Sequence, residues 1–161
     1  MSNHIMRLIK LNWIGPFAYG PRGIEASKFD SHATEIELKK HLGKPGIYIV
    51  IGDHPIHGSR SLLYIGRSSR LERRLDEHYN WIAEEWRVEI YLAVIKKKKD
   101  REYVESLLIH AHSPAYNSKN IESINIAPSI QIWNQGRFWR LFPEISSDNP
   151  WYENISKRRI S

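Results

Sequence analysis

The stretch from Pro45 to His78 reads PGIYIVIGDHPIHGSRSLLYIGRSSRLERRLDEH. Two short apolar runs, 46–51 and 61–65, flank a segment rich in glycine, proline, aspartate and serine, which is the pattern of a β-hairpin. Each run contains one tyrosine, Tyr48 in the first and Tyr64 in the second. The pattern therefore predicts two tyrosines on neighbouring strands.

A helix is expected to follow at once, over residues 69–86. Ser69 and Glu72 form a capping-box pattern at its start. At about 100° per residue, one arc of this helix is apolar; it comprises Leu71, Leu75, Tyr79, Ile82 and Trp86. Arg74 and His78 are four residues apart, so they are neighbours on one flank of that arc. If the arc packs on the hairpin, both side chains face the two tyrosines.

The remaining elements follow from periodicity and from turn residues. The N-terminal segment predicts a strand over 5–14, an irregular loop over 15–23 and a helix over 31–42. A strand over 87–95 precedes a second helix, 100–112, with Asp100 as its N-cap and an end before Ser113-Pro114. Strands over 129–134 and 137–142, joined by Gln135-Gly136, predict a C-terminal β-hairpin.

Glu105 has an unusual position on the second helix. The apolar arc of this helix comprises Val104, Leu107, Leu108 and Ala111, with Ile109 beyond it, and Glu105 falls between Leu108 and Ile109. A carboxylate placed there is partly desolvated, which is costly unless a cation compensates. Glu105 is therefore a candidate metal ligand or ion-pair partner. An ion pair with Arg101, four residues earlier, would account for it equally well.

Composition limits the classes of protein to consider. A chain of 161 residues with 41% hydrophobic content is long enough for one domain with its own core. It has no cysteine, which excludes disulfides and thiolate metal sites. No apolar run approaches the ~20 residues of a membrane span, and the N-terminus lacks the apolar region of a signal peptide. We therefore expect a cytoplasmic protein with no membrane partner. The net charge of +6 favours a polyanionic partner.

Together these residues resemble the GIY-YIG nuclease superfamily. Gly46-Ile47-Tyr48 and Tyr64-Ile65-Gly66 match the two triplets that give the family its name. Arg74 and His78 stand ten and fourteen residues after the tyrosine of the second triplet, as in homing-endonuclease members. Either triplet alone is common in strands, but the order and spacing of all these elements are specific.

The second helix extends the resemblance. Glu105 is followed nine residues later by Pro114 and twelve later by Asn117, as in the nuclease subunit of bacterial nucleotide excision repair. The implied fold is α/β (α+β), with a core over residues 45–118 in which helices flank a three-stranded sheet. Residues 1–44 and 119–161 would then be additions to a single domain, 1–161, the second containing the C-terminal hairpin. The Gly52–Ser61 connection is longer than in many members.

The resemblance implies hydrolysis of DNA phosphodiester bonds with one Mg²⁺ or Mn²⁺ ion. Glu105 resembles the family's metal ligand, and Mg²⁺ suits a sparse site made of oxygen ligands. Arg74 would hold the scissile phosphate through its fork of donors. Tyr48 and Tyr64 would position and deprotonate the attacking water, with His78 as proton relay or orienting group, and Asn117 completes the catalytic set. Which of Tyr48, Tyr64 and His78 takes the proton stays open.

Other basic residues are candidates for contacts with DNA: Arg67, Arg70, Lys96, Lys97, Lys98, Arg137 and Arg140. Near the last two, Trp133, Phe138 and Trp139 have two interpretations. They either complete a second small core with Trp13 or form a DNA-facing surface on which bases stack.

The expected function is that of a sequence-specific, restriction-type DNA endonuclease, because compact additions wrap both ends of the core. One alternative is a structure-specific or low-specificity nuclease of repair or mobile-element origin. A second is a non-catalytic DNA-binding module on the same fold. Since the chain has a single site, cutting both strands would require a homodimer or two successive events.

Overall fold

The computed structural model describes residues 6–20, 23–26, 33–78, 81, 88–119 and 129–148. Within these residues, seven strands form one sheet in the order β4-β3-β5-β1-β6-β7, with β2 paired to β1. The strands are β1 Arg7–Gly20, β2 Gly23–Ala26, β3 Gly46–His54, β4 Gly58–Ser68, β5 Glu89–Val94, β6 Ile130–Gly136 and β7 Glu144–Ser146. The helices are α1 Ala33–Leu42, α2 Leu71–Glu77 and α4 Lys98–His112. The mixed α/β class agrees with the prediction.

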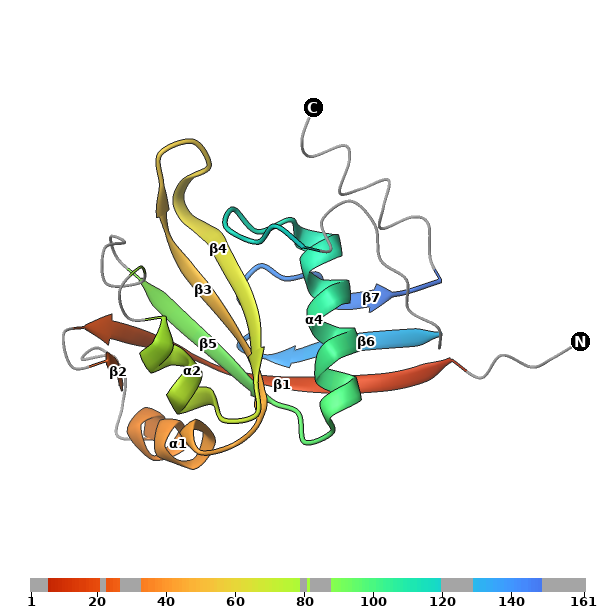
Figure 1. Cartoon of the computed structure of the whole chain (residues 1–161), viewed down its shortest axis with the longest axis horizontal. Coiled ribbons are helices and arrows are strands. Elements are labelled where there is room, and N and C mark those ends of the chain that lie inside the picture. Colours follow the sequence, from red (N-terminus) through yellow and green to blue (C-terminus); the bar gives the residue numbers. More distant parts are fainter. Residues whose placement is uncertain are drawn as a thin grey trace, which may run out of the picture.

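The strands β4, β3 and β5 form the antiparallel unit that carries both tyrosine triplets. Along β3 the side chains alternate between the two faces of the sheet, as the pleat requires. Ile47, Ile49 and Ile51 belong to the core cluster that includes α4, whereas Tyr48 and Val50 pack in the cluster that includes α1 and α2. The helices α2 and α4 accordingly lie on either side of the β3–β4 ribbon (Figure 1).

The helix α4 buries the arc that its periodicity predicts. Val104, Leu107, Leu108, Ile109 and Ala111 are all buried. The helix ends at Ser113 in a left-handed conformation, just before Pro114. Its start differs from the prediction: Lys97 is the N-cap, and Asp100 lies within the first turn, where it forms an ion pair of 2.7 Å with Arg7. No helix among the described residues has the length and apolar character needed to cross a membrane.

Strand β1 joins the core sheet to the C-terminal segment. Residues 7–13 pair in parallel with β6, and residues 13–18 pair antiparallel with β5. The loop predicted over 15–23 is therefore wrong for residues 15–20, which continue the strand. A register shift between Ile14 and Phe17 accommodates Gly15-Pro16, because proline has no N–H for the ladder.

Two local predictions on either side of α2 need correction. The strands of the first hairpin extend to His54 and begin again at Gly58, so most of the expected Gly52–Ser61 loop is strand. The Ser69 capping box is absent, because α2 starts after Arg70, whose N–H donates to Ser68 Oγ at 3.0 Å. The predicted continuation of the helix to residue 86 falls largely on residues 79–80 and 82–87, outside those described.

The C-terminal segment also differs from its prediction. The first expected strand is present as β6, but residues 137–142 form turns, and β6 pairs instead with β7. Phe138 and Trp139 pack on the same cluster as Trp13, so they extend the main core rather than forming a second one. Trp133 remains 36% exposed, with the Lys10 ammonium 5.5 Å from its ring.

Candidate active site

Tyr48 lies on β3 directly opposite Gly66, the glycine of the second triplet, on the edge strand β4. Its ring is fully buried and crosses over Gly66: a Cβ atom at this glycine would lie 2.4 Å from Tyr48 Oη. Because neighbouring strands are about 4.8 Å apart, a tyrosine reaching across one strand brings its hydroxyl to the outer edge of β4. Gly66 therefore lets a core residue reach the border of the sheet.

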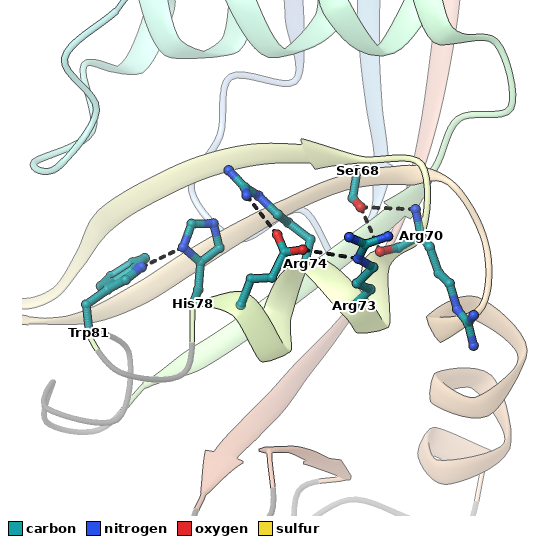
Figure 2. Close-up of polar contacts among 7 residues, drawn as sticks. Ser68, Arg70, Arg73, Arg74, His78 and Trp81 are labelled. Carbon is teal, nitrogen blue, oxygen red and sulfur yellow. Dashed lines mark hydrogen bonds and ion pairs between the residues drawn. The ribbon is translucent and has the colours of Figure 1, made fainter.

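Two further rings gather around that hydroxyl. The ring centroid of Tyr64 is 6.0 Å from that of Tyr48. The His78 ring lies 5.9 Å from Tyr48 and 5.3 Å from Tyr64. The expectation that the α2 side faces the two tyrosines is thus met for His78, and Figure 2 shows His78 and Arg74 rising from α2 towards the strands.

The protonation state of His78 follows from its neighbour Trp81. The Trp81 indole N–H donates to His78 Nδ1 at 2.7 Å (Figure 2). An indole can only donate, so Nδ1 accepts and the proton of the neutral ring resides on Nε2. Burial, assisted by the Arg74 charge, lowers the pKa of His78, while Glu77 opposes this shift. At neutral pH His78 is therefore an uncharged ring that presents an N–H donor.

Two buried polar atoms of this cluster have no hydrogen-bond partner of normal geometry among the described residues: Tyr48 Oη and His78 Nε2. Such unpaired groups are rare in folded proteins and cost about 1–3 kcal/mol each. They belong to adjacent rings at the edge of the sheet. A site that binds water or a polar substrate would give both groups a partner.

Arg74 supplies the positive charge of the cluster. It is half-exposed on α2, where its guanidinium contacts Glu77 at 2.9 Å, and Arg73 contacts the same carboxylate at 3.1 Å (Figure 2). Burial and the nearby Tyr64 raise the pKa of Tyr48, and the Arg74 charge opposes this shift. Tyr48 is consequently a neutral phenol at neutral pH, and additional positive charge would be needed to ionise it.

Glu105 approaches the same edge from α4, on the other side of the ribbon. Its side chain is 20% exposed, and its Oε2 accepts a hydrogen bond of 2.7 Å from Arg67 Nε. Burial raises the pKa of Glu105, while Arg67 and Arg74 oppose the shift. The alternative partner Arg101 is excluded, since its guanidinium donates to the carbonyls of Ile95 and Lys96 instead.

Glu105 suits a divalent cation with few protein ligands. Among the described residues, no three histidine, cysteine, aspartate or glutamate side chains form a ready-made metal site. A single, partly exposed carboxylate fits an ion that keeps most of its waters, as Mg²⁺ does. Its oxygen already pairs with the Arg67 cation. The donor set therefore fits one hydrated ion rather than an enclosed structural metal.

Asn117 is bonded through its side chain to the backbone of β4. Its side-chain oxygen accepts from the Ile65 N–H at 2.9 Å, and its amide nitrogen donates to the Ile65 carbonyl at 3.0 Å. Ala115 and Tyr116 donate their backbone N–H groups to Leu62 and Leu63. Asn117 is thus placed to position the strand that carries Tyr64 and Gly66.

The candidate DNA-binding residues have different surroundings. Arg70 pairs with Glu72 at 3.3 Å, and Arg137 donates to the Gly15 carbonyl at 3.1 Å. The Arg140 guanidinium lies 5.6 Å from the Trp139 ring. Lys96, Lys97 and Lys98 are exposed where α4 begins. Arg67 contacts a residue of the candidate site, Glu105.

Three contributions to the site were missed by the sequence analysis. Trp81 is three residues after His78, a spacing that predicts neighbours on a helix and could have identified it. The cross-strand role of Gly66 requires the register of the hairpin. The pairing of Arg67 with Glu105 joins residues 38 apart, and no local signal indicates it.

Comparison with known proteins gives a sequence relative and a set of solved structures. No family model matches the chain. UvrABC system protein C of Thermosipho africanus (strain TCF52B) is 30% identical over 80 residues, which is 46% of this chain and 13% of that protein. The chain thus matches only a small part of its curated relative.

Among solved structures, the magnesium-bound GIY-YIG N-terminal endonuclease domain of UvrC from Thermotoga maritima is 24% identical. The match covers 55% of the present chain and 100% of the UvrC domain, with a TM-score of 0.40. A point mutant of the same domain, bound to its catalytic divalent cation, is 23% identical over 56% of this chain and 100% of that chain, with a TM-score of 0.40.

Proposed function

We propose that this chain is a divalent-metal-dependent DNA endonuclease of the GIY-YIG nuclease superfamily. The proposed family assignment is supported by the two triplets and by the sequence similarity to UvrC. The observation that carries the proposed activity is the convergence of Tyr48, Tyr64, His78 and Arg74 at one edge of β4, with Glu105 approaching the same edge.

Each residue of the cluster has a chemical role in this proposal. Glu105 would hold one Mg²⁺ or Mn²⁺ ion, which supplies Lewis-acid stabilisation of the charge that develops on the phosphate. For Arg74 to bind the scissile phosphate through two donors, its contact with Glu77 would have to be exchanged or shared. His78 acts as a donor through Nε2, which orients a water or a phosphate oxygen.

The general base is one of the two tyrosines. In the tautomer that Trp81 imposes, His78 Nε2 already carries a proton and cannot accept another. Tyr48 has a raised pKa, so it becomes a base only when substrate and metal bring additional positive charge close to it. Tyr64 is the partly exposed tyrosine and is more open to an incoming water.

A plasmid-nicking assay tests the proposal. Purified protein is incubated with supercoiled plasmid and Mg²⁺, beside Glu105→Gln and a sample with EDTA. The proposal predicts nicking by the wild type alone. Equal nicking by both proteins, or none by either, would overturn it. Binding to DNA that weakens steeply with salt, without any product, would identify a non-catalytic DNA-binding module.

Sequencing the product ends separates the finer assignments. We favour a restriction-type enzyme, because compact additions flank the core on both sides. Such an enzyme is expected to leave a shared motif at the product ends. Scattered ends, with preference for branched or damaged substrates, would indicate the repair-type alternative, which the similarity to UvrC supports. Sedimentation of the protein with and without DNA would test whether a homodimer delivers two cuts.

A further inference from the structure

The β3–β4 hairpin continues well beyond the sheet. Strand β5 accompanies β3 only as far as Ile51, whereas β3 and β4 stay paired out to His54 and Gly58. The last part of the hairpin is therefore a two-stranded ribbon ending in the turn 55–57. Figure 1 shows this ribbon projecting past the end of β5.

The tip of the ribbon is closed by hydrogen bonds to its own polar side chains. His54 Nδ1 accepts from the backbone N–H groups of Ile56 at 3.2 Å and His57 at 3.1 Å. Asp53 Oδ1 accepts from the Arg60 N–H at 3.0 Å. These bonds fix the turn, and the side chain of Ile56 is left 86% exposed at its end. A fixed turn that presents an apolar side chain to solvent suggests a binding surface.

A row of ring contacts links this tip to the candidate active site. The His57 ring centroid is 4.6 Å from that of His54, which is 5.5 Å from Tyr116. The Tyr116 ring is 5.8 Å from Trp81, and Trp81 is 5.6 Å from Tyr64. A continuous row of ring contacts thus connects the tip to the site.

The spacing is suited to a nucleic acid duplex. Tyr64 pairs near Val50, six residues before Ile56. At about 3.3 Å per strand residue the tip is roughly 20 Å from Tyr64, which corresponds to about six base pairs at 3.4 Å each. A duplex whose backbone is held at the site would therefore pass the tip within one helical turn.

We propose that the turn 55–57 is a DNA-docking element that enters the minor groove of duplex DNA beside the cleavage site, with Ile56 as a wedge at a base step. Small apolar side chains such as isoleucine and proline partially unstack base steps when they insert from the minor groove. Pro55 and Ile56 place two such side chains at the tip. This inference rests on the proposed nuclease function, since it takes DNA as the occupant.

The test compares Ile56→Ser with Ile36→Ser, which alters another exposed isoleucine, 52% exposed on α1. Both changes are made in the Glu105→Gln background so that DNA is bound and not cut. Binding to a labelled duplex is followed by fluorescence anisotropy over a range of salt concentrations. We expect Ile56→Ser to weaken binding about tenfold, with an unchanged salt slope because no phosphate contact is lost. Ile36→Ser is expected to leave binding unchanged.

A duplex series with 2-aminopurine at successive positions reports the unstacking directly. Fluorescence should rise at one step in the complex with Glu105→Gln, which retains Ile56. It should stay low in the complex with the variant that also carries Ile56→Ser. Equal affinity and equal fluorescence for both would overturn the inference while leaving the nuclease function intact. A protein that binds no duplex at all would overturn both. A change in sedimentation without a change in DNA affinity would assign the tip to a protein contact and also overturn the proposal.

Discussion

At the scale of single residues, the candidate site depends on Gly66, a residue without a side chain. Gly66→Ala would place a methyl group 2.4 Å from Tyr48 Oη, so the tyrosine ring must move. Overpacking of this kind costs about 1–3 kcal/mol. We expect a lower melting temperature and near-complete loss of nicking. Gly43→Ala is the matched control, because nothing lies within 4 Å of its added Cβ. Full activity in Gly66→Ala would show that the position of Tyr48 is unimportant.

If Glu105 holds the proposed metal ion, Arg67 competes with that ion for its carboxylate. Its guanidinium occupies Glu105 Oε2 at 2.7 Å and has a second carboxylate, that of Glu102, 3.8 Å away. Removing a competing charge in Arg67→Gln should strengthen Mn²⁺ binding, measured by calorimetry, by up to about tenfold. Arg67→Lys keeps the charge and should stay near the wild type.

Glu102 gives this competition a second test. When the ion binds, a displaced Arg67 needs another partner, and Glu102 is the candidate. If Arg67 then pairs with Glu102, Glu102→Gln should weaken Mn²⁺ binding in the wild type but not in the Arg67→Gln background. Weaker binding in both backgrounds would mean that Glu102 contacts the ion itself. Weaker binding on removal of Arg67 would show that Arg67 supports the metal and does not compete with it.

At the scale of elements, residues 115–117 act on β4 from beyond the end of α4. Asn117→Ala removes both hydrogen bonds to Ile65, which at about 1 kcal/mol each destabilises the fold by about 1–3 kcal/mol. If Asn117 positions Tyr64, the nicking rate should fall even well below the melting temperature, with Mn²⁺ affinity unchanged. Asn12→Ala, on an exposed position of β1, is the control. A normal nicking rate of Asn117→Ala well below its melting temperature would limit Asn117 to a structural role.

The elements also separate what local sequence can predict from what it cannot. The buried arc of α4 and the two tyrosine strands follow from periodicity within about fifteen residues. The continuation of β1 through Gly15-Pro16 does not, because its hydrogen bonds come from β5, more than seventy residues away. The ribbon past Ile51 and the turns at 137–142 have the same origin: pairing and packing between distant segments override local turn residues.

At the scale of the whole molecule, the burial of Glu105 makes the stability of the fold depend on pH. Burial raises its pKa in the folded state. Its contribution to stability is therefore present below the pKa of the unfolded chain and is lost as pH rises through the raised folded value. Glu105→Gln should melt at about the same temperature as the wild type near pH 4, and at a higher temperature near pH 7.5 without metal. A difference that stays constant with pH would contradict this.

The whole site was less predictable than its members. The resemblance to the GIY-YIG superfamily predicts a set made of Tyr48, Tyr64, Arg74, His78 and Glu105. The structure brings the first four into one cluster. Their protonation and pairing were not predictable, because these depend on burial and on partners such as Arg67 and Trp81. The catalytic roles themselves stay predictions that the nicking assay tests.

The hydrogen bonds from residues 115–117 have a consequence for the behaviour of the protein in solution. Strand β4 is at the edge of the sheet, and an open edge is a template for pairing with a strand of another molecule. Ala115, Tyr116 and Asn117 cover this edge from Leu62 to Ile65. The segment that positions the second tyrosine triplet therefore also protects the chain against edge-to-edge aggregation, so loss of Asn117 should lower solubility as well as activity.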